Sequence, residues 1–450
     1  MSTRQKLLIA VLPLIIALTL ITGSFLLASG SGKISEKRLN TAASSLSELI
    51  IKGNSVKDQG AGHPKYVLFF GSSELRRFDP FHPSVLAEKY QRGYRPFLLG
   101  TAGTQSLIHF LSLHSMADGI AGQRAVFIIS PQWFQRRGIG EGSFDEFFSL
   151  MQVYDWICKN DTDAASRVYF AERMLDFKII RKNSFLRGVL EKIAEGGKPR
   201  PAEIMRCQNQ LRLLNTEDHI FGKFFVESHR RAIRTYMKKL PDTYDADQLD
   251  ALAFQVGEQA SGNNAFQIQN RYYTNRIQPR LDFFKGRQKA VSYDKSPEYG
   301  DFQLVLSEIA KDGMDVLFVI PPVNKRWAEY VGLRKDMYLR FEAKIKEQLT
   351  AQGFDRILDL SRRGGDSYFM QDPTHLGWRG WVAIDRAVQP FLEGADGDRA
   401  APAYPEGADG NRAAPAYPEG ADGNRAAPVY RIDPYYFSDE WCSIVPPEMP

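Results

Sequence analysis

A serine that follows a predicted buried strand is the first candidate for chemistry in this sequence. Residues 66–75 read YVLFFGSSEL, an apolar run that ends in Gly-Ser-Ser-Glu. The run is typical of a buried strand, and its glycine allows a sharp turn. Ser73 would then lie at the carboxyl end of a strand, where open α/β sheets keep their sites. A serine hydroxyl needs a nearby base and oxyanion donors before it is a good nucleophile.

The candidate base is His375, which follows Asp372 in the stretch DPTH. One turn of backbone can bring both side chains to one face, and the carboxylate would fix the tautomer of the imidazole. Each motif alone also has a structural explanation, because Gly-Ser-Ser is common in loops and Asp before Pro is a good helix N-cap. Their order favours a Ser–His–Asp triad, since Ser73 opens the folded domain and His375 precedes its last helix.

Three further residues follow other predicted strands and are candidates for oxyanion or substrate contacts. They are Gly103 in the Gly-rich turn 100–105, Gln132 after strand 124–130, and Asn324 after strand 315–320. The Gly-rich turn offers free N–H groups at a helix start but matches neither the dinucleotide nor the phosphate-loop fingerprint.

In the loop RRFDPFHPS, Asp79 and His82 would either touch substrate or shape a turn.

No metal or cofactor is expected. The cysteines have no metal-ligand spacing, and three unpaired thiols are a simpler reading than one disulfide. They are Cys158, Cys207 and Cys442. Four scattered histidines are interpreted as structural or exposed: His109, His114, His219 and His229.

The order of apolar patterns predicts an α/β protein with a five-stranded parallel sheet in a three-layer sandwich. The predicted strands are 66–70, 95–100, 124–130, 315–320 and 356–360. Between the third and fourth strands, residues 144–290 show apolar side chains at three- and four-residue spacing. This spacing predicts a helical insertion that would serve as a lid, a polymer groove or a partner surface.

Four regions follow along the chain. Residues 7–28 carry no charge and follow Arg4 and Lys6, so residues 1–32 are predicted as a transmembrane anchor with a cytoplasmic amino end. A cleaved signal peptide is the alternative, but its apolar region is usually shorter. Residues 33–65 are predicted as a stalk and 66–392 as an extracytoplasmic catalytic domain. Residues 393–450 contain a 13-residue repeat, beginning EGADGDRAAPAYP, that predicts disorder.

Charge is distributed unevenly. Residues 393–450 hold 4 Arg and 11 Asp or Glu, so the rest of the chain carries a net +12 although the whole carries +5. Such a body suits an acidic lipid surface or a polyanionic substrate, although a solvated basic surface is also common.

The layout resembles the SGNH hydrolase fold. In that family the nucleophile follows a Gly-Asp-Ser core; here the triplet is Gly71-Ser72-Ser73, with Ser73 in the nucleophile's place. The family's Gly-x-Asn-Asp block has no clear match, and Ser130–Trp133 occupies its position.

Further blocks are similar to the DltD family of D-alanyl transfer proteins over roughly residues 1–392: GSSELRRFDPFHPS, FLLGTAGTQSL, FIISPQWF, PPVN and DPTHLGWRGW.

The DltD resemblance implies a role in D-alanylation of lipoteichoic acid, outside the cell membrane and beside the membrane acyltransferase DltB. D-alanine would come from the D-alanyl carrier pathway, Ser73 would carry the acyl group, His375 would be the base and Asp372 would orient it. No nucleic-acid partner is implied. Two alternatives stay open: an SGNH esterase or thioesterase acting on D-alanyl esters, and a non-catalytic scaffold for the carrier protein or DltB.

Overall fold

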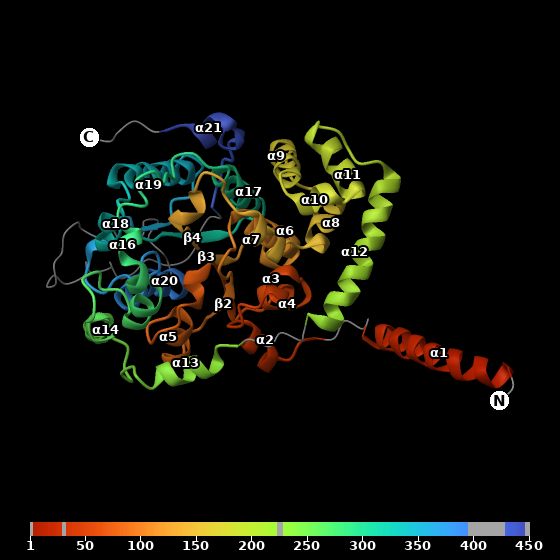
Figure 1. Ribbon diagram of the computed structural model, residues 1–450, viewed down its shortest axis with the longest axis horizontal. Coiled ribbons are helices and arrows are strands. Elements are labelled where there is room, and N and C mark those ends of the chain that lie inside the picture. The colour runs from red at the N-terminus through yellow and green to blue at the C-terminus, as the bar shows by residue number, and fades with distance from the viewer. Residues whose placement is uncertain (1–2, 29–32, 223–227, 395–427, 446–450) are drawn as a thin grey trace.

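A parallel sheet forms the centre of the computed structural model, which describes residues 3–28, 33–222, 228–394 and 428–445 (Figure 1). The strands are β1 Tyr66–Phe70, β2 Arg95–Leu99, β3 Arg124–Ile128, β4 Asp315–Ile320 and β5 Ile357–Asp359. They lie in the order β2-β1-β3-β4-β5, and every neighbouring pair is parallel. The predicted five-stranded parallel sheet is therefore confirmed.

Different helices cover the two faces of the sheet, as expected for strands that are apolar on both faces. Side chains alternate along β1, so Leu68 and Phe70 join one hydrophobic cluster and Phe69 joins the other. The first cluster includes residues of α6 Ser106–Ile120, α17 Glu298–Lys311 and α19 Lys335–Thr350. The second includes residues of α5 Pro83–Lys89 and α20 Trp378–Glu393. Helices, sheet and helices thus form three layers.

The strand order places a topological switch point at the carboxyl ends of β1 and β3. From β1 the chain passes to β2 on one side, and then to β3 on the other side of β1. The loops that leave β1 and β3 therefore diverge, and in doubly wound sheets ligands bind at this point. Two short 3₁₀-helices follow these strands here, η1 Ser73–Arg76 and η2 Pro131–Phe134. Both predicted site residues in them, Ser73 and Gln132, therefore lie beside the switch point.

The stretch predicted as a helical insertion contains helices and no strand among its described residues, and it packs in three places. In the first place, α8 Leu150–Lys159 contacts α6, α12 Pro201–Phe221 contacts α8, and α9 Ala164–Leu175 contacts α17. Two further helices, α10 Lys178–Lys182 and α11 Ser184–Ala194, contact α9, and α7 Glu141–Phe147 contributes Phe144 and Phe147 to the hydrophobic cluster that contains α6. On the opposite face of the sheet, α13 Arg230–Met237 contacts α5 and α14 Ala246–Ser261 contacts α20. A third part, with α15 Asn270–Tyr272, the π-helix Tyr273–Ile277, η4 Gln278–Arg280 and α16 Leu281–Phe284, packs on α18 Lys325–Val331.

The prediction of a stalk over residues 33–65 is wrong. This stretch forms α2 Glu36–Ala42, α3 Glu48–Lys52 and α4 Ser55–Ala61. Most of its apolar side chains point inward: Leu39, Ile50, Ile51 and Val56 are buried in the cluster that contains β1. The polar composition was misleading because these short helices need only one or two inward residues per turn to pack.

The amino-terminal helix α1 Thr3–Ala28 extends away from the body near α12 (Figure 1). Apolar side chains on it, such as Leu14 and Leu18, are exposed. Within the described residues, no helix was found with the length and apolar character needed to cross a membrane. The anchor over residues 1–32 stays a prediction.

The last part of the chain contains a folded segment. Residues 395–427, with nearly all of the repeat, lie outside the described residues. Residues 428–445, named here the C-terminal strap, form η6 Pro434–Phe437 and α21 Asp439–Ser443 and pack against α17. Trp441 is only 2% exposed. The strap belongs to the folded body because two of its aromatic side chains, Tyr436 and Trp441, are buried.

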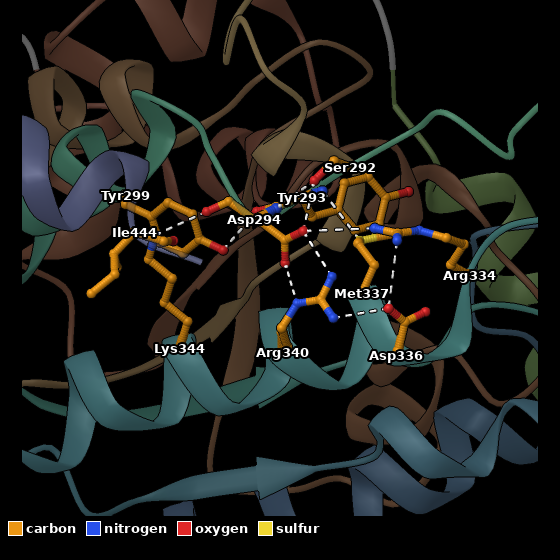
Figure 2. Close-up of polar contacts among 10 residues, drawn as sticks. All are labelled: Ser292, Tyr293, Asp294, Tyr299, Arg334, Asp336, Met337, Arg340, Lys344 and Ile444. Carbon is orange, nitrogen blue, oxygen red and sulfur yellow. Dashed lines mark hydrogen bonds and ion pairs between the residues drawn. The ribbon is translucent and has the colours of Figure 1, made fainter. Parts of the chain in front are cut away.

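A buried lysine fastens the end of the strap (Figure 2). Lys344 Nζ on α19 donates to the carbonyl oxygens of Asp294 (3.0 Å) and Ile444 (3.2 Å). It also lies 5.0 Å from the ring centre of Trp441. Arg340, one turn earlier, holds the Asp294 carboxylate through two hydrogen bonds of 3.0 and 3.1 Å. Strap and domain thus share one polar network.

Candidate active site

Ser73 is placed by a crowded turn after β1. The Gly71 carbonyl accepts hydrogen bonds from Thr104 Oγ1 (3.0 Å) and His109 Nε2 (2.9 Å). Gly100, with φ +150°, lies so close that a Cβ there would be 2.0 Å from the Gly71 oxygen. Only glycine fits this approach of the β1 and β2 loops, so the backbone before Ser73 is fixed from two sides.

The structure separates the two adjacent serines. Ser72 is buried, and its Oγ donates to the Thr101 carbonyl at 3.1 Å. Ser73 is partly exposed, and its Oγ lies 2.6 Å from His375 Nε2. Ser72 therefore serves the fold of the turn, and Ser73 alone faces the candidate base.

Glu74 supports the turn from beneath and was not predicted from the sequence. Its buried carboxylate accepts from the Ser72 backbone N–H (2.5 Å) and from Ser130 Oγ (3.2 Å). Burial raises the pKa of Glu74 despite these bonds. The carboxylate ties the β1 turn to the end of β3 across the switch point.

His375 and Asp372 meet as the DPTH spacing predicted. The His375 Nδ1 lies 2.8 Å from both Asp372 carboxylate oxygens. Asp372 Oδ1 also accepts the backbone N–H groups of Thr374 and His375, each at 3.0 Å. With the proton on Nδ1 shared with Asp372, the Nε2 lone pair faces Ser73 Oγ. This geometry allows proton transfer from Ser73 Oγ to His375 Nε2.

Arg77 is the second site residue that sequence reasoning missed. Its Nη2 lies 3.0 Å from Asp372 Oδ2 and 3.4 Å from His375 Nδ1, and its guanidinium lies 5.6 Å from the ring centre of Tyr272. Although burial alone would raise the pKa of Asp372, His375 and Arg77 lower it below its usual range. The only signal in the sequence was a basic pair, Arg76-Arg77, four residues beyond the serine.

The other predicted residues take different roles. Gly103 adopts φ +100° in the turn between β2 and α6, and a Cβ there would lie 2.9 Å from Ser143 Oγ. Gln132 is partly exposed, and its Oε1 has no hydrogen-bond partner within the described chain. Both stay candidates for the oxyanion.

The prediction that Asn324 contacts substrate is not supported, because its side chain is already used. Asn324 Oδ1 caps α18 by accepting from the Trp327 N–H (3.0 Å), and its Nδ2 donates to the Phe266 carbonyl (3.0 Å). Its backbone N–H donates to the Pro373 carbonyl (3.0 Å). Asn324 thus positions the loop that carries Asp372 and His375.

Asp79 and His82 build the loop after Ser73 and do not face solvent. Asp79 accepts from the Phe81 N–H at 2.7 Å, and burial raises its pKa to about 7. His82 Nε2 donates to the Leu75 carbonyl (3.2 Å), and burial lowers the pKa of His82 to about 3. Of the two proposed roles, the structure supports turn-building.

Other chemistry finds little support in the described residues. They hold no group of three His, Cys, Asp or Glu placed to bind a metal ion. The three cysteines, Cys158, Cys207 and Cys442, are free. Burial raises their pKa values to about 11, 12 and 11, so all three are neutral thiols at physiological pH.

Comparison with known proteins agrees with this architecture. A family model described as DltD protein matches residues 43–393. The chain is 41% identical over 382 residues to Protein DltD of Lacticaseibacillus rhamnosus, which covers 85% of this chain and 90% of the relative. It is 32% identical over 384 residues to Protein DltD of Bacillus subtilis strain 168 (85% and 96% covered). It is 26% identical over 367 residues to Protein DltD of Staphylococcus aureus (81% and 90% covered). The chain belongs to the DltD family.

Proposed function

We propose that this protein is an acyltransferase that carries a D-alanyl group on Ser73 and passes it to lipoteichoic acid outside the membrane. The observation that carries the proposal is the line of contacts from Ser73 Oγ to His375 Nε2 (2.6 Å) and from His375 Nδ1 to Asp372 (2.8 Å). Membership of the family supports D-alanine as the acyl group, since that is the role the sequence resemblance implies.

In the first step Ser73 is acylated. His375 Nε2 takes the Ser73 proton as Oγ attacks the carbonyl carbon of a D-alanyl ester or thioester. The tetrahedral intermediate collapses when its bond to the leaving alcohol or thiol breaks, and His375 returns the proton to that group. Asp372 remains ionised and stabilises the imidazolium.

In the second step the acceptor replaces the leaving group. A hydroxyl of the polyol-phosphate chain loses its proton to His375 and attacks the acyl carbon, and the released Ser73 Oγ takes the proton back. Both tetrahedral intermediates need N–H donors. The Ser72 N–H is bound to Glu74, whereas the N–H groups of Ser73 and Gly103 have no hydrogen-bond partner among the described residues, so these two and Gln132 are the proposed donors.

The paired serines provide the test and its control. We expect cells that contain only Ser73→Ala to lack D-alanine esters on teichoic acid, and cells that contain only Ser72→Ala to keep most of them. Immunoblots of the membrane fraction control for protein level. Normal ester content with Ser73→Ala would refute the proposal and favour a scaffold for DltB or the carrier protein.

A second measurement separates transfer from hydrolysis. The purified protein is incubated with a D-alanyl thioester, and the peptide containing Ser73 is examined by mass spectrometry for the acyl group. Acyl-Ser73 that decays faster when polyol-phosphate chains are added supports a transferase. Decay at the same rate in buffer alone would identify an esterase or thioesterase.

A further inference from the structure

A strongly basic segment borders the candidate active site. Residues 269–290 contain six exposed cations and a single acid, Asp282. The cations, named here the basic rim, are Arg271, Arg276, Arg280, Lys285, Arg287 and Lys289. In the described parts of the chain none of the six forms an ion pair, whereas basic residues elsewhere, such as Arg379 with Asp250, are paired. The positive charge of the rim is therefore not neutralised by ion pairs among the described residues.

The start of this segment is bound directly to the catalytic loop. The Gln269 N–H donates to the carbonyl of Gln371 (2.9 Å), the residue before Asp372, and the Gln371 N–H donates to the His375 carbonyl (2.9 Å). Tyr272 lies beneath the Arg77 guanidinium that contacts Asp372. The rim therefore begins beside the triad.

The rest of the segment is held in place along α18. Phe266 and Phe284 pack on the Trp327 ring with centres 5.3 and 5.5 Å away. Tyr330 Oη donates to the Leu281 carbonyl (2.9 Å), and the Gln288 N–H donates to the Val331 carbonyl (2.8 Å). The six cations thus stand on a fixed backbone, which reduces the entropy lost when they bind a ligand.

We propose that the basic rim binds the polyol-phosphate chain of the acceptor and leads its hydroxyl groups to Ser73. A polyanionic chain with several phosphates suits a cluster of exposed cations that form no ion pair among the described residues, and Arg in particular pairs well with phosphate oxygens. This inference rests on the proposed function for the identity of the chain, but binding itself does not require acyl transfer. Polymer binding by the basic rim and acyl transfer through Ser73 can therefore be refuted separately.

The test compares two triple variants of the full chain, both in the Ser73→Ala background. The rim variant carries Arg271→Gln, Arg276→Gln and Lys285→Gln. The control carries Lys178→Gln, Lys182→Gln and Lys198→Gln, which removes three exposed cations from the region of α10 and α11. The probe is poly(glycerol phosphate) freed of D-alanine, and its dissociation constant is measured at low and high salt.

We expect the rim variant to bind the polymer about 10-fold more weakly at low salt and the control to bind it within about twofold of the parent. The difference should shrink at about 0.5 M salt, where exposed charges are screened. Equal affinities for the rim variant and the parent, or an equal loss in the control, would overturn the proposal. Circular dichroism of both variants excludes misfolding as the cause of a loss.

A final experiment uses the rim variant with Ser73 intact. The rim substitutions should leave hydrolysis of a small uncharged ester unchanged but lower D-alanyl transfer to the polymer. If Ser73 does not catalyse ester chemistry at all, the binding measurement still decides whether the rim holds the polymer. Loss of small-ester hydrolysis in the rim variant would show that these residues support the triad instead.

Discussion

Replacing Arg77 with glutamine should impair catalysis without unfolding the protein. Two unit charges about 4 Å apart attract by about 4 kcal/mol at an effective dielectric constant of about 20. Here the Arg77 side chain is 31% exposed. Asp372 also keeps three N–H donors, from Thr374, from the His375 backbone and from the His375 ring. These factors reduce the expected loss to about 1–2 kcal/mol, or about 5- to 30-fold in kcat/KM.

The pH dependence gives a sharper readout than the rate alone. His375 and Arg77 hold the pKa of Asp372 low against the effect of burial, so the carboxylate form is favoured and is lost as pH falls through that pKa. Without Arg77 the pKa of Asp372 should rise toward its ordinary value. The part of the acid limb of the kcat/KM profile that depends on ionised Asp372 should therefore move to higher pH.

The assay is ester cleavage or D-alanyl transfer measured across the acidic range. Arg77→Lys should be faster than Arg77→Gln but slower than the parent. Lysine restores the positive charge but lacks the planar guanidinium group with its several N–H donors. The control is Arg231→Gln, which removes an exposed arginine from α13. If Arg77→Gln leaves both the rate and the acid limb unchanged, Arg77 does not act through Asp372.

Three further predictions concern stability. Gly100→Ala should lower Tm and ester content together, because its Cβ would lie 2.0 Å from the Gly71 carbonyl oxygen at a φ that alanine rarely adopts; an unchanged Tm would contradict this. Trp441→Ala should destabilise the protein by about 3–5 kcal/mol, the usual cost of removing a buried tryptophan, and denaturant unfolding measures it. Burial lowers the pKa values of His82 and His109 from 6.5 to about 3, so the unfolded state takes up protons first as pH falls. The free energy of unfolding should then drop across this window by roughly 4 kcal/mol per histidine, and a flat urea midpoint between pH 6.5 and 3 would refute it.

The sequence predicted those features that depend on local pattern. A short apolar run such as YVLFF, rich in aromatic side chains and followed by glycine, is typical of a buried strand, and the strands alternate with helices in an order that favours a parallel sheet. The spacing in DPTH limits how far Asp372 and His375 can separate. Their approach to Ser73, about three hundred residues away, followed from the rule that sites gather at the carboxyl ends of parallel strands.

The remaining features depend on tertiary contacts that periodicity does not encode. Arg77 and Glu74 lie within four residues of Ser73, yet their roles depend on Asp372 and Ser130. Asn324 follows a strand, a position suited to contact with substrate. Its side chain is instead hydrogen-bonded to the Phe266 carbonyl and the Trp327 N–H. Composition likewise suggested a stalk where short helices are buried, because composition does not record which way a side chain points.

The C-terminal strap has a consequence for how the repeat can change over generations. Residues 395–427 join two fixed points: the end of α20, where Glu393 accepts the Gly93 N–H at 2.8 Å, and the strap held by Lys344. Gain or loss of one 13-residue copy leaves the sequences of both fixed points and the reading frame of the strap unchanged. Slippage during replication that preserves the reading frame therefore keeps Trp441 and the rest of the strap in the protein. A frameshift or stop in the same stretch would remove Trp441 and its neighbours, so purifying selection should act on the reading frame of the repeat rather than on its copy number.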